Sequence, residues 1–159
     1  MLCVRVKKKT MTTIEFDKVY IESKFEEAEK QLLDANNLYS IHYENFDVTT
    51  FDKHNSTLLN AISGKSIVYC LWIGESYNSL HPKYIGHANR TISRQRMRAH
   101  LTKKNKATGS QLDKITLYLR EKKYFGLTYL IIEPSYMRKS LEDWLINKNS
   151  KFLDWNINK

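Results

Sequence analysis

Hydrophobic side chains recur at helical spacing in several separate segments of this chain. Ser23 and Glu26 have the spacing of an N-terminal capping box, and apolar positions then recur every three or four residues up to Asn36. Three later segments show the same period: 92–101, 112–119 and 137–145. The pattern predicts four amphipathic helices, of which only the first lies in the N-terminal third.

Uninterrupted apolar runs occur at 67–73 and 127–132, and both have the length and composition of buried strands. The second run follows Gly126, and its continuous apolar character predicts a central strand that is covered on both faces. Segment 74–82 is polar and rich in turn formers, so we expect residues 84–86 to return antiparallel to the first strand as a hairpin. Residues 38–64 show no clear period and are predicted to be irregular.

This order of elements predicts an α/β (α+β) sandwich with a small three-stranded, mostly antiparallel sheet flanked by helices. With 159 residues the chain is long enough for one domain with a real core and too short for two. We divide it into an N-terminal extension, 1–64, with one amphipathic helix, and a main domain, 65–159. Met11 is an alternative start, which would make residues 1–10 an unstructured leader.

The charge balance indicates a polyanionic partner. The chain carries 26 Lys and Arg against 17 Asp and Glu, a formal net charge of +9, which favours binding to nucleic acid through the release of counterions. Seven of the basic residues fall in one stretch that contains no acidic residue, and this stretch overlaps the second predicted helix. They are Arg90, Arg94, Arg96, Arg98, Lys103, Lys104 and Lys106. We expect Arg90, Arg94, Arg98, Lys103 and Lys104 to contact the nucleic acid.

Cysteine usage and hydropathy indicate the cellular compartment. The two cysteines, Cys3 and Cys70, give neither a disulfide framework nor the spacing of a zinc site. The longest apolar run is far shorter than the ~20 residues needed to cross a bilayer, and the basic residues near the start are not followed by a signal-peptide core. We therefore expect a soluble, cytoplasmic protein.

Five features with polar or ionisable side chains follow one another on the predicted elements. The first predicted strand begins with the triplet Ile67-Val68-Tyr69, which ends in a tyrosine. The next strand reads Tyr84-Ile85-Gly86. The basic helix carries Arg96 and, four residues later, His100, the last helix carries Glu142, and Trp155-Asn156-Ile157 closes the chain. Over 66–157, this set in this order resembles the GIY-YIG nuclease superfamily, with an intact YIG half and a GIY half that keeps only its tyrosine.

The resemblance implies a metal-dependent DNA endonuclease of the restriction, homing or phage type. It implies the following catalytic set: Tyr69, Tyr84, Arg96, His100, Glu142 and Asn156. Glu142 would hold one Mg²⁺ (or Mn²⁺) ion, and Arg96 would grip the scissile phosphate with two donors. Tyr69 would be the general base, assisted by His100, and Asn156 would orient the phosphate or Glu142.

Each of these residues also has a plainer interpretation. Tyr69 and Tyr84 fit ordinary packing of a half-buried sheet. Arg94 competes with Arg96 for the role of the site arginine, because they are only two residues apart. Glu142 has the spacing of a surface ion pair with Arg138, and Asn156 fits a residue that caps the fold. The remaining histidines show no metal-ligand spacing and are predicted to lie on the surface or in loops: His42, His54, His81 and His87.

The leading functional hypothesis is therefore a DNA endonuclease acting on double- or single-stranded DNA. Cleavage of both strands would require two copies of one such site, which makes a homodimer possible, with residues 1–64 and the 74–82 loop supplying target or dimer contacts. The alternative is a catalytically inactive nucleic-acid-binding module on the same fold, which the degenerate GIY half leaves open. Loss of plasmid cleavage in EDTA would separate the two.

Overall fold

The computed structural model describes residues 12–44, 50–102 and 112–156. Its centre is a sheet of four strands, β1 (Tyr39–Ile41), β2 (Ile67–Gly74), β3 (Leu80–Ala88) and β4 (Tyr124–Ile131), in the order β1-β4-β2-β3. All three pairings are antiparallel. The α+β class is confirmed, but the prediction of three strands is wrong by one. The strand missed, β1, has only three residues and forms because the edge of β4 offers it partners.

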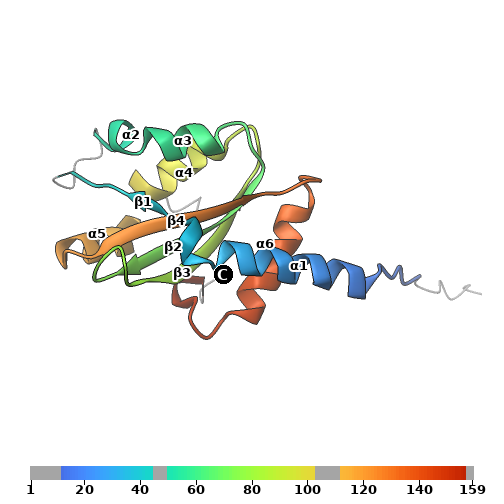
Figure 1. The fold of residues 1–159 in the computed structure, drawn as a ribbon. Coiled ribbons are helices and arrows are strands. Elements are labelled where there is room, and N and C mark those ends of the chain that lie inside the picture. Colours follow the sequence, from blue (N-terminus) through green and yellow to red (C-terminus); the bar gives the residue numbers. More distant parts are fainter. Residues whose placement is uncertain (1–11, 45–49, 103–111, 157–159) are drawn as a thin grey trace, which may run out of the picture.

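Helices cover both faces of this sheet (Figure 1). The helices are α1 (Lys18–Leu32), α2 (Phe51–His54), α3 (Ser56–Ile62), α4 (Ser93–Thr102), α5 (Leu112–Arg120) and α6 (Met137–Lys148), with short 3-10 turns η1 (Ala35–Asn37) and η3 (Asp154–Asn156). The four predicted helices correspond to α1, α4, α5 and α6. The prediction of irregular structure at 38–64 is wrong for α2, α3 and β1. Helix α1 begins before Ser23, because Asp17 accepts a hydrogen bond from the Tyr20 amide and caps it there.

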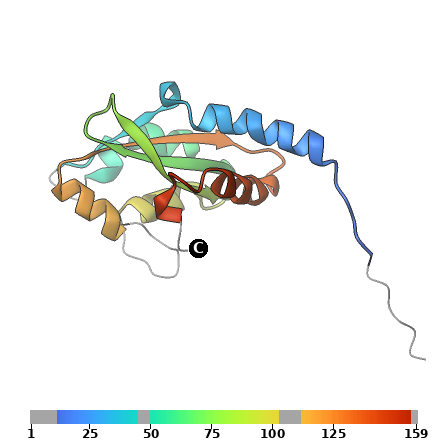
Figure 2. The same ribbon diagram turned by 90° about the horizontal axis from the view of Figure 1, so that it is seen from below.

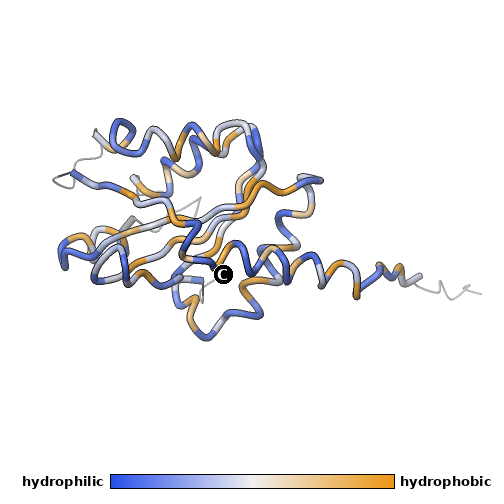
Figure 3. Tube along the Cα trace, in the orientation of Figure 1, coloured by the Kyte–Doolittle hydropathy of each residue, from blue (hydrophilic) through white to orange (hydrophobic). Residues whose placement is uncertain are grey.

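Two apolar layers fill the space between the sheet and the helices, and Figure 3 shows the hydrophobic residues concentrated along the central strands. On one face, side chains of α2 to α5 pack on alternate positions of the strands, among them Leu59, Met97 and Ile115. On the other face, α1 and α6 supply Leu32 and Leu145. As predicted, β4 is central, because it lies between β1 and β2.

The β2–β3 hairpin differs from the predicted one in its loop. Strand β3 begins at Leu80, so the predicted loop at 74–82 is too long and the connection is only residues 75–79. Pro82 lies within β3, which is possible because β3 is an edge strand with one side free of ladder hydrogen bonds. The register shifts beside it: Leu71 pairs with Tyr84 and Trp72 with Pro82, which leaves Lys83 as an extra residue.

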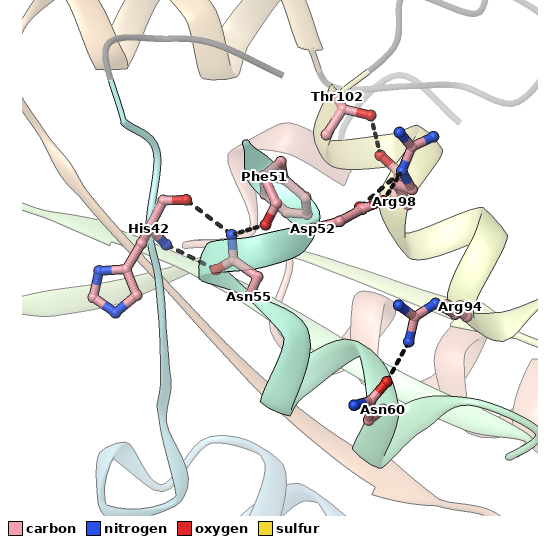
Figure 4. Close-up of polar contacts among 8 residues, drawn as sticks. All are labelled: His42, Phe51, Asp52, Asn55, Asn60, Arg94, Arg98 and Thr102. Atoms are coloured by element: carbon pink, nitrogen blue, oxygen red, sulfur yellow. Dashed lines mark hydrogen bonds and ion pairs between the residues drawn. The ribbon is translucent and has the colours of Figure 1, made fainter. Parts of the chain in front are cut away.

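Asparagine side chains bind the backbone near both edges of the sheet. Asn55 pairs with both the amide and the carbonyl of His42, just after β1, at 2.9 and 2.8 Å (Figure 4). Asn156 does the same to Ile85 in β3, at 2.8 and 2.9 Å. Each asparagine side chain thus makes the hydrogen bonds that a neighbouring strand would make. It pairs backbone N–H and C=O groups that the edge of a sheet would otherwise leave unpaired.

The N-terminal part of the chain is built into this fold. Strand β1 pairs with β4, and Ile41, Phe51 and Leu59 belong to the same apolar layer as residues of β2 and α4. Residues 12–17, just before α1, instead point away from the body (Figure 2). In the described ranges, no helix combines the length and the apolar character needed to cross a membrane. The boundary at residue 64 stays a prediction.

Candidate active site

Tyr69, Tyr84 and His100 meet on one face of the sheet. The two tyrosines come from the paired strands β2 and β3, and His100 comes from α4, which packs on that face. The ring centroids of Tyr69 and Tyr84 are 6.2 Å apart, and His100 lies 6.4 Å from Tyr69 and 6.3 Å from Tyr84. All three side chains are buried, at 2 to 3% exposure. The tertiary structure therefore brings together three residues of the predicted set.

Gly86 gives the Tyr69 ring its position. Tyr69 is paired directly with Gly86 across the ladder. A Cβ atom at Gly86 would lie 2.5 Å from the Tyr69 hydroxyl oxygen and 2.6 Å from its Cζ, closer than any normal contact. The phenol thus lies over the strand where no side chain intervenes. The glycine of the YIG triplet has a steric function here, because only its missing side chain leaves room for the tyrosine.

Arg96 and Arg94 point to different places. The Arg96 Nε atom is buried and has no hydrogen-bond partner among the described residues, and the Arg96 charge partly offsets the rise that burial causes in the pKa of Tyr69. Arg94 instead donates from Nη1 to Asn60 Oδ1 of α3 at 2.6 Å (Figure 4). Of the two arginines, Arg96 is the one beside the buried tyrosine.

Glu142 approaches from the opposite side of the edge strand β3. It lies on α6, which packs on the other face of the sheet, and it is only 3% exposed. Its Oε2 atom lies 3.4 Å from Nε2 of His87. Its charge raises the pKa of Tyr69. Glu142 is thus a buried carboxylate, unlike the exposed partner of Arg138 that its sequence spacing also allowed.

His87 was missed by the sequence interpretation, which assigned it to the surface or to a loop. The structure places it in β3, half-buried and against Glu142. Side chains alternate along a strand, so His87 points to the face opposite Gly86, toward α6. Its position directly after the YIG triplet was the available signal. That position places His87 on the strand only if β3 continues past Gly86. The predicted strand ended at Gly86.

Asn156 acts on the backbone of β3. Both polar atoms of its amide are engaged with Ile85, which lies between the tyrosine and the glycine of the triplet. Asn156 therefore holds the strand that carries Tyr84, Gly86 and His87. In the described part of the chain, its amide makes no hydrogen bond to Glu142, the contact expected as one of its two roles.

Several buried polar atoms in this region lack a hydrogen-bond partner within the described residues. They are His87 Nδ1, Arg96 Nε and Arg138 Nε. These groups also influence one another electrostatically: Arg96 acts on both Tyr69 and His87, and Arg138 acts on His87. Buried polar groups in folded proteins are nearly always paired with protein, water or an ion. An anion or an ordered water molecule bound to these groups would satisfy them.

Burial raises the pKa of the Tyr69 phenol well above its ordinary value, and Tyr84 and Glu142 raise it further. Arg96 opposes this rise. A tyrosine that acts as a base needs a lowered pKa. In the free protein, Tyr69 is therefore a hydrogen-bond donor, and its use as a base requires more positive charge nearby than Arg96 provides.

The side chains around Glu142 fit a hard divalent ion that takes few of its ligands from the protein. No group of three or more His, Cys, Asp or Glu side chains able to hold a metal occurs in the described ranges. Mg²⁺ commonly binds proteins through one or two carboxylates and keeps water and phosphate oxygens as its other ligands. One buried carboxylate suits that mode, whereas it does not suit a closed zinc site.

The predicted nucleic-acid-binding arginines have partners within the protein. Arg90 pairs with Glu133 at 3.2 Å, and Arg98 donates from Nε to both carboxylate oxygens of Asp52 at 2.8 and 2.9 Å (Figure 4). Arg94 donates to Asn60. These side chains remain partly or fully exposed, but each must share its charge or leave its partner to bind a phosphate. Lys103 and Lys104, with Lys106, lie outside the described residues.

Comparison of the chain with family models, with curated protein sequences and with solved structures finds no match.

Proposed function

We propose that the chain is a metal-dependent DNA endonuclease of the GIY-YIG type, which hydrolyses phosphodiester bonds. The observation that carries this proposal is the buried carboxylate of Glu142 against His87 of β3, with the buried, unpaired Nε atom of Arg96 on α4, a helix that also contacts β3. A phosphate oxygen would accept hydrogen bonds from Arg96 and Tyr69, and it would compensate the positive charge of Arg96. A basic helix alone would carry less weight, because surface charges need no ligand, whereas buried polar groups are nearly always paired with protein, water or an ion.

Hydrolysis needs positive charge at one phosphate and a route for protons. A water oxygen attacks phosphorus and loses a proton, the bond from phosphorus to one bridging oxygen breaks, and the leaving oxygen takes up a proton. The products are a phosphate monoester and a hydroxyl. Negative charge accumulates on the phosphate oxygens in the transition state, so donors fixed in advance lower the barrier.

Residues of this chain can supply most of these needs. The Arg96 guanidinium cannot deprotonate and can bind two phosphate oxygens. Tyr69 is held over Gly86 and would donate a hydrogen bond to the phosphate, and its contact with Tyr84 and His100 limits the motion of its ring. Glu142 would hold the divalent ion, which supplies Lewis acidity to the phosphate when bound. Asn156 keeps the β3 backbone in place through Ile85.

The test replaces Glu142 with glutamine and measures cleavage of end-labelled single- and double-stranded DNA with Mg²⁺, Mn²⁺ and EDTA. E142Q keeps the size of the side chain but removes the charge that binds the ion, so we expect cleavage to fall by a factor on the order of 100 or more. DNA binding should persist or tighten, because a negative charge near the phosphate has gone.

The matched control is D143N, one residue further along α6. Asp143 is exposed and paired only with Lys139 at 3.8 Å among the described residues, so its neutralisation should leave cleavage unchanged. A folded E142Q protein that cuts DNA at the parental rate would contradict the metal assignment. The alternative, an inactive nucleic-acid-binding module, is favoured by the raised pKa of Tyr69. It requires that the parent protein bind DNA and cut nothing with either metal.

A further inference from the structure

Arg138 carries a second guanidinium that the proposed reaction does not use. It lies in the first turn of α6, half-buried, and its Nη1 donates to the Ser135 carbonyl oxygen at 2.6 Å. This contact fixes the guanidinium plane. Its Nε atom is buried and has no hydrogen-bond partner in the described ranges. An arginine that is anchored at one nitrogen and unpaired at another has a donor available for an anion.

Its place in the fold puts Arg138 beside the candidate site. Arg138 and Glu142 are four residues apart on α6 and therefore share one face of the helix. Glu142 on that face lies against His87 of β3. Arg96 lies on α4, which packs on the opposite face of the sheet, and both helices contact the edge strand β3. The two arginines thus lie on helices on either side of β3.

The position of Arg138 on α6 also favours a bound anion. Arg138 is a cation in the first turn of the helix, where the helix dipole disfavours positive charge and favours negative charge, and this turn contains no acidic residue.

We propose that Arg138 forms a second phosphate-binding subsite, so that the DNA backbone is held between Arg96 on α4 and Arg138 on α6. The identity of the anion as a DNA phosphate rests on the proposed function. The subsite itself rests on the anchored guanidinium of Arg138 and on its unpaired Nε donor. A backbone held from both faces of the sheet lies across the edge strand, with the bond to be cut beside Glu142.

The experiment measures binding of a fluorescein-labelled DNA duplex by anisotropy, in EDTA and over a range of salt concentrations. We compare the parent with R138Q, R138K and the matched control K139Q, which removes one exposed positive charge from the neighbouring position. R138Q should weaken binding at least about fivefold and reduce the salt slope by about one. R138K should fall between R138Q and the parent, because it keeps the charge but has no Nε donor. K139Q should change the affinity less than about twofold.

A thermal melt of each variant shows whether it folds. R138K can still donate to the Ser135 carbonyl, so it keeps the test valid if R138Q does not fold. Equal affinities and salt slopes for R138K and the parent, or for folded R138Q and K139Q, would overturn the subsite. Competition with inorganic phosphate in the same assay should weaken DNA binding by the parent more than by R138Q, and equal competition would count against the subsite.

Failure of the proposed function is a separate result. If the parent cuts DNA while the Arg138 variants keep its affinity and KM, the subsite is wrong and the nuclease proposal stands. If the parent cuts nothing with Mg²⁺ or Mn²⁺ but R138Q still loses affinity, the nuclease proposal is wrong and the subsite stands.

Discussion

Replacement of Gly86 by alanine is the smallest change that should displace the Tyr69 hydroxyl. The new Cβ atom would lie 2.5 Å from Tyr69 Oη, 2.6 Å from Tyr69 Cζ and 3.0 Å from Tyr84 Cε1. Ordinary contacts begin near ~3.5 Å, so the phenol must move by roughly 1 Å. Tyr69 has little room to do so, because it is buried between Tyr84 and His100.

Two effects of different size follow from this displacement. Insertion of a methyl group into a packed region costs about 1–3 kcal/mol of unfolding free energy, which is roughly 3–10 °C in Tm for a protein of this length. A displacement of about 1 Å in a reacting group can cost about 100-fold in rate. G86A should therefore fold at 25 °C and lose far more activity than its stability loss explains.

The assay is single-turnover cleavage of labelled DNA, together with thermal melting. The matched control is G126A in β4, where the new Cβ atom would lie 2.8 Å from Leu80 Cδ1 and 2.9 Å from Leu38 Cδ2. Those atoms are the ends of flexible side chains away from the candidate site. G126A should therefore show a similar or smaller loss of Tm and a parental cleavage rate at 25 °C.

Two results would contradict this prediction. A folded G86A protein that cuts at the parental rate would show that the position of the Tyr69 hydroxyl does not matter to the reaction. An unchanged Tm for G86A would show that the close approach of Tyr69 to β3 does not exist in the protein.

Two further predictions concern the arginines of α4. R96K should lose most of the cleavage rate, because a lysine cannot reproduce two-point binding of a phosphate. R94K should lose little of that rate, because Arg94 donates to Asn60 instead. The opposite ranking in a cleavage assay would transfer the site to Arg94. D52N should tighten DNA binding at low salt by about two- to fivefold and steepen its salt dependence, because it frees Arg98 from its carboxylate partner; unchanged binding in a salt titration would mean that this side of α4 does not face the nucleic acid.

Local patterns in the sequence were sufficient where an element is long and buries one face. Helices α4 and α6 were predicted because their apolar positions repeat at helical spacing over 92–101 and 137–145, and strands β2 and β4 because of the uninterrupted apolar runs 67–73 and 127–132. The Arg96–His100 pair lies on α4 and the YIG triplet on the strand that follows β2, so their order along the chain indicated a set of residues that meet. The structure does bring Tyr69, Tyr84 and His100 into contact.

The short elements were not predicted from the sequence, because their stability comes from partners far away along the chain. Strand β1 has three residues, α2 has four and α3 has seven, too few to display a period. Strand β1 forms because β4 pairs with it. Helix α3 forms because Leu58, Leu59 and Ile62 pack in one apolar layer with residues of β2 and α4. No local window of sequence contains those partners.

The details of the candidate site likewise depended on the tertiary structure. The Asn156 side chain binds Ile85 across 71 positions of sequence, and it can do so only because η3 folds back onto the free edge of β3. His87 faces Glu142 because β3 extends to Ala88 and alternates its side chains across the sheet. The sequence by itself determined which residue types the site has available. Packing of α4 and α6 on opposite faces of one edge strand decided which of them share a site, because the distance between residues in space depends on the whole fold.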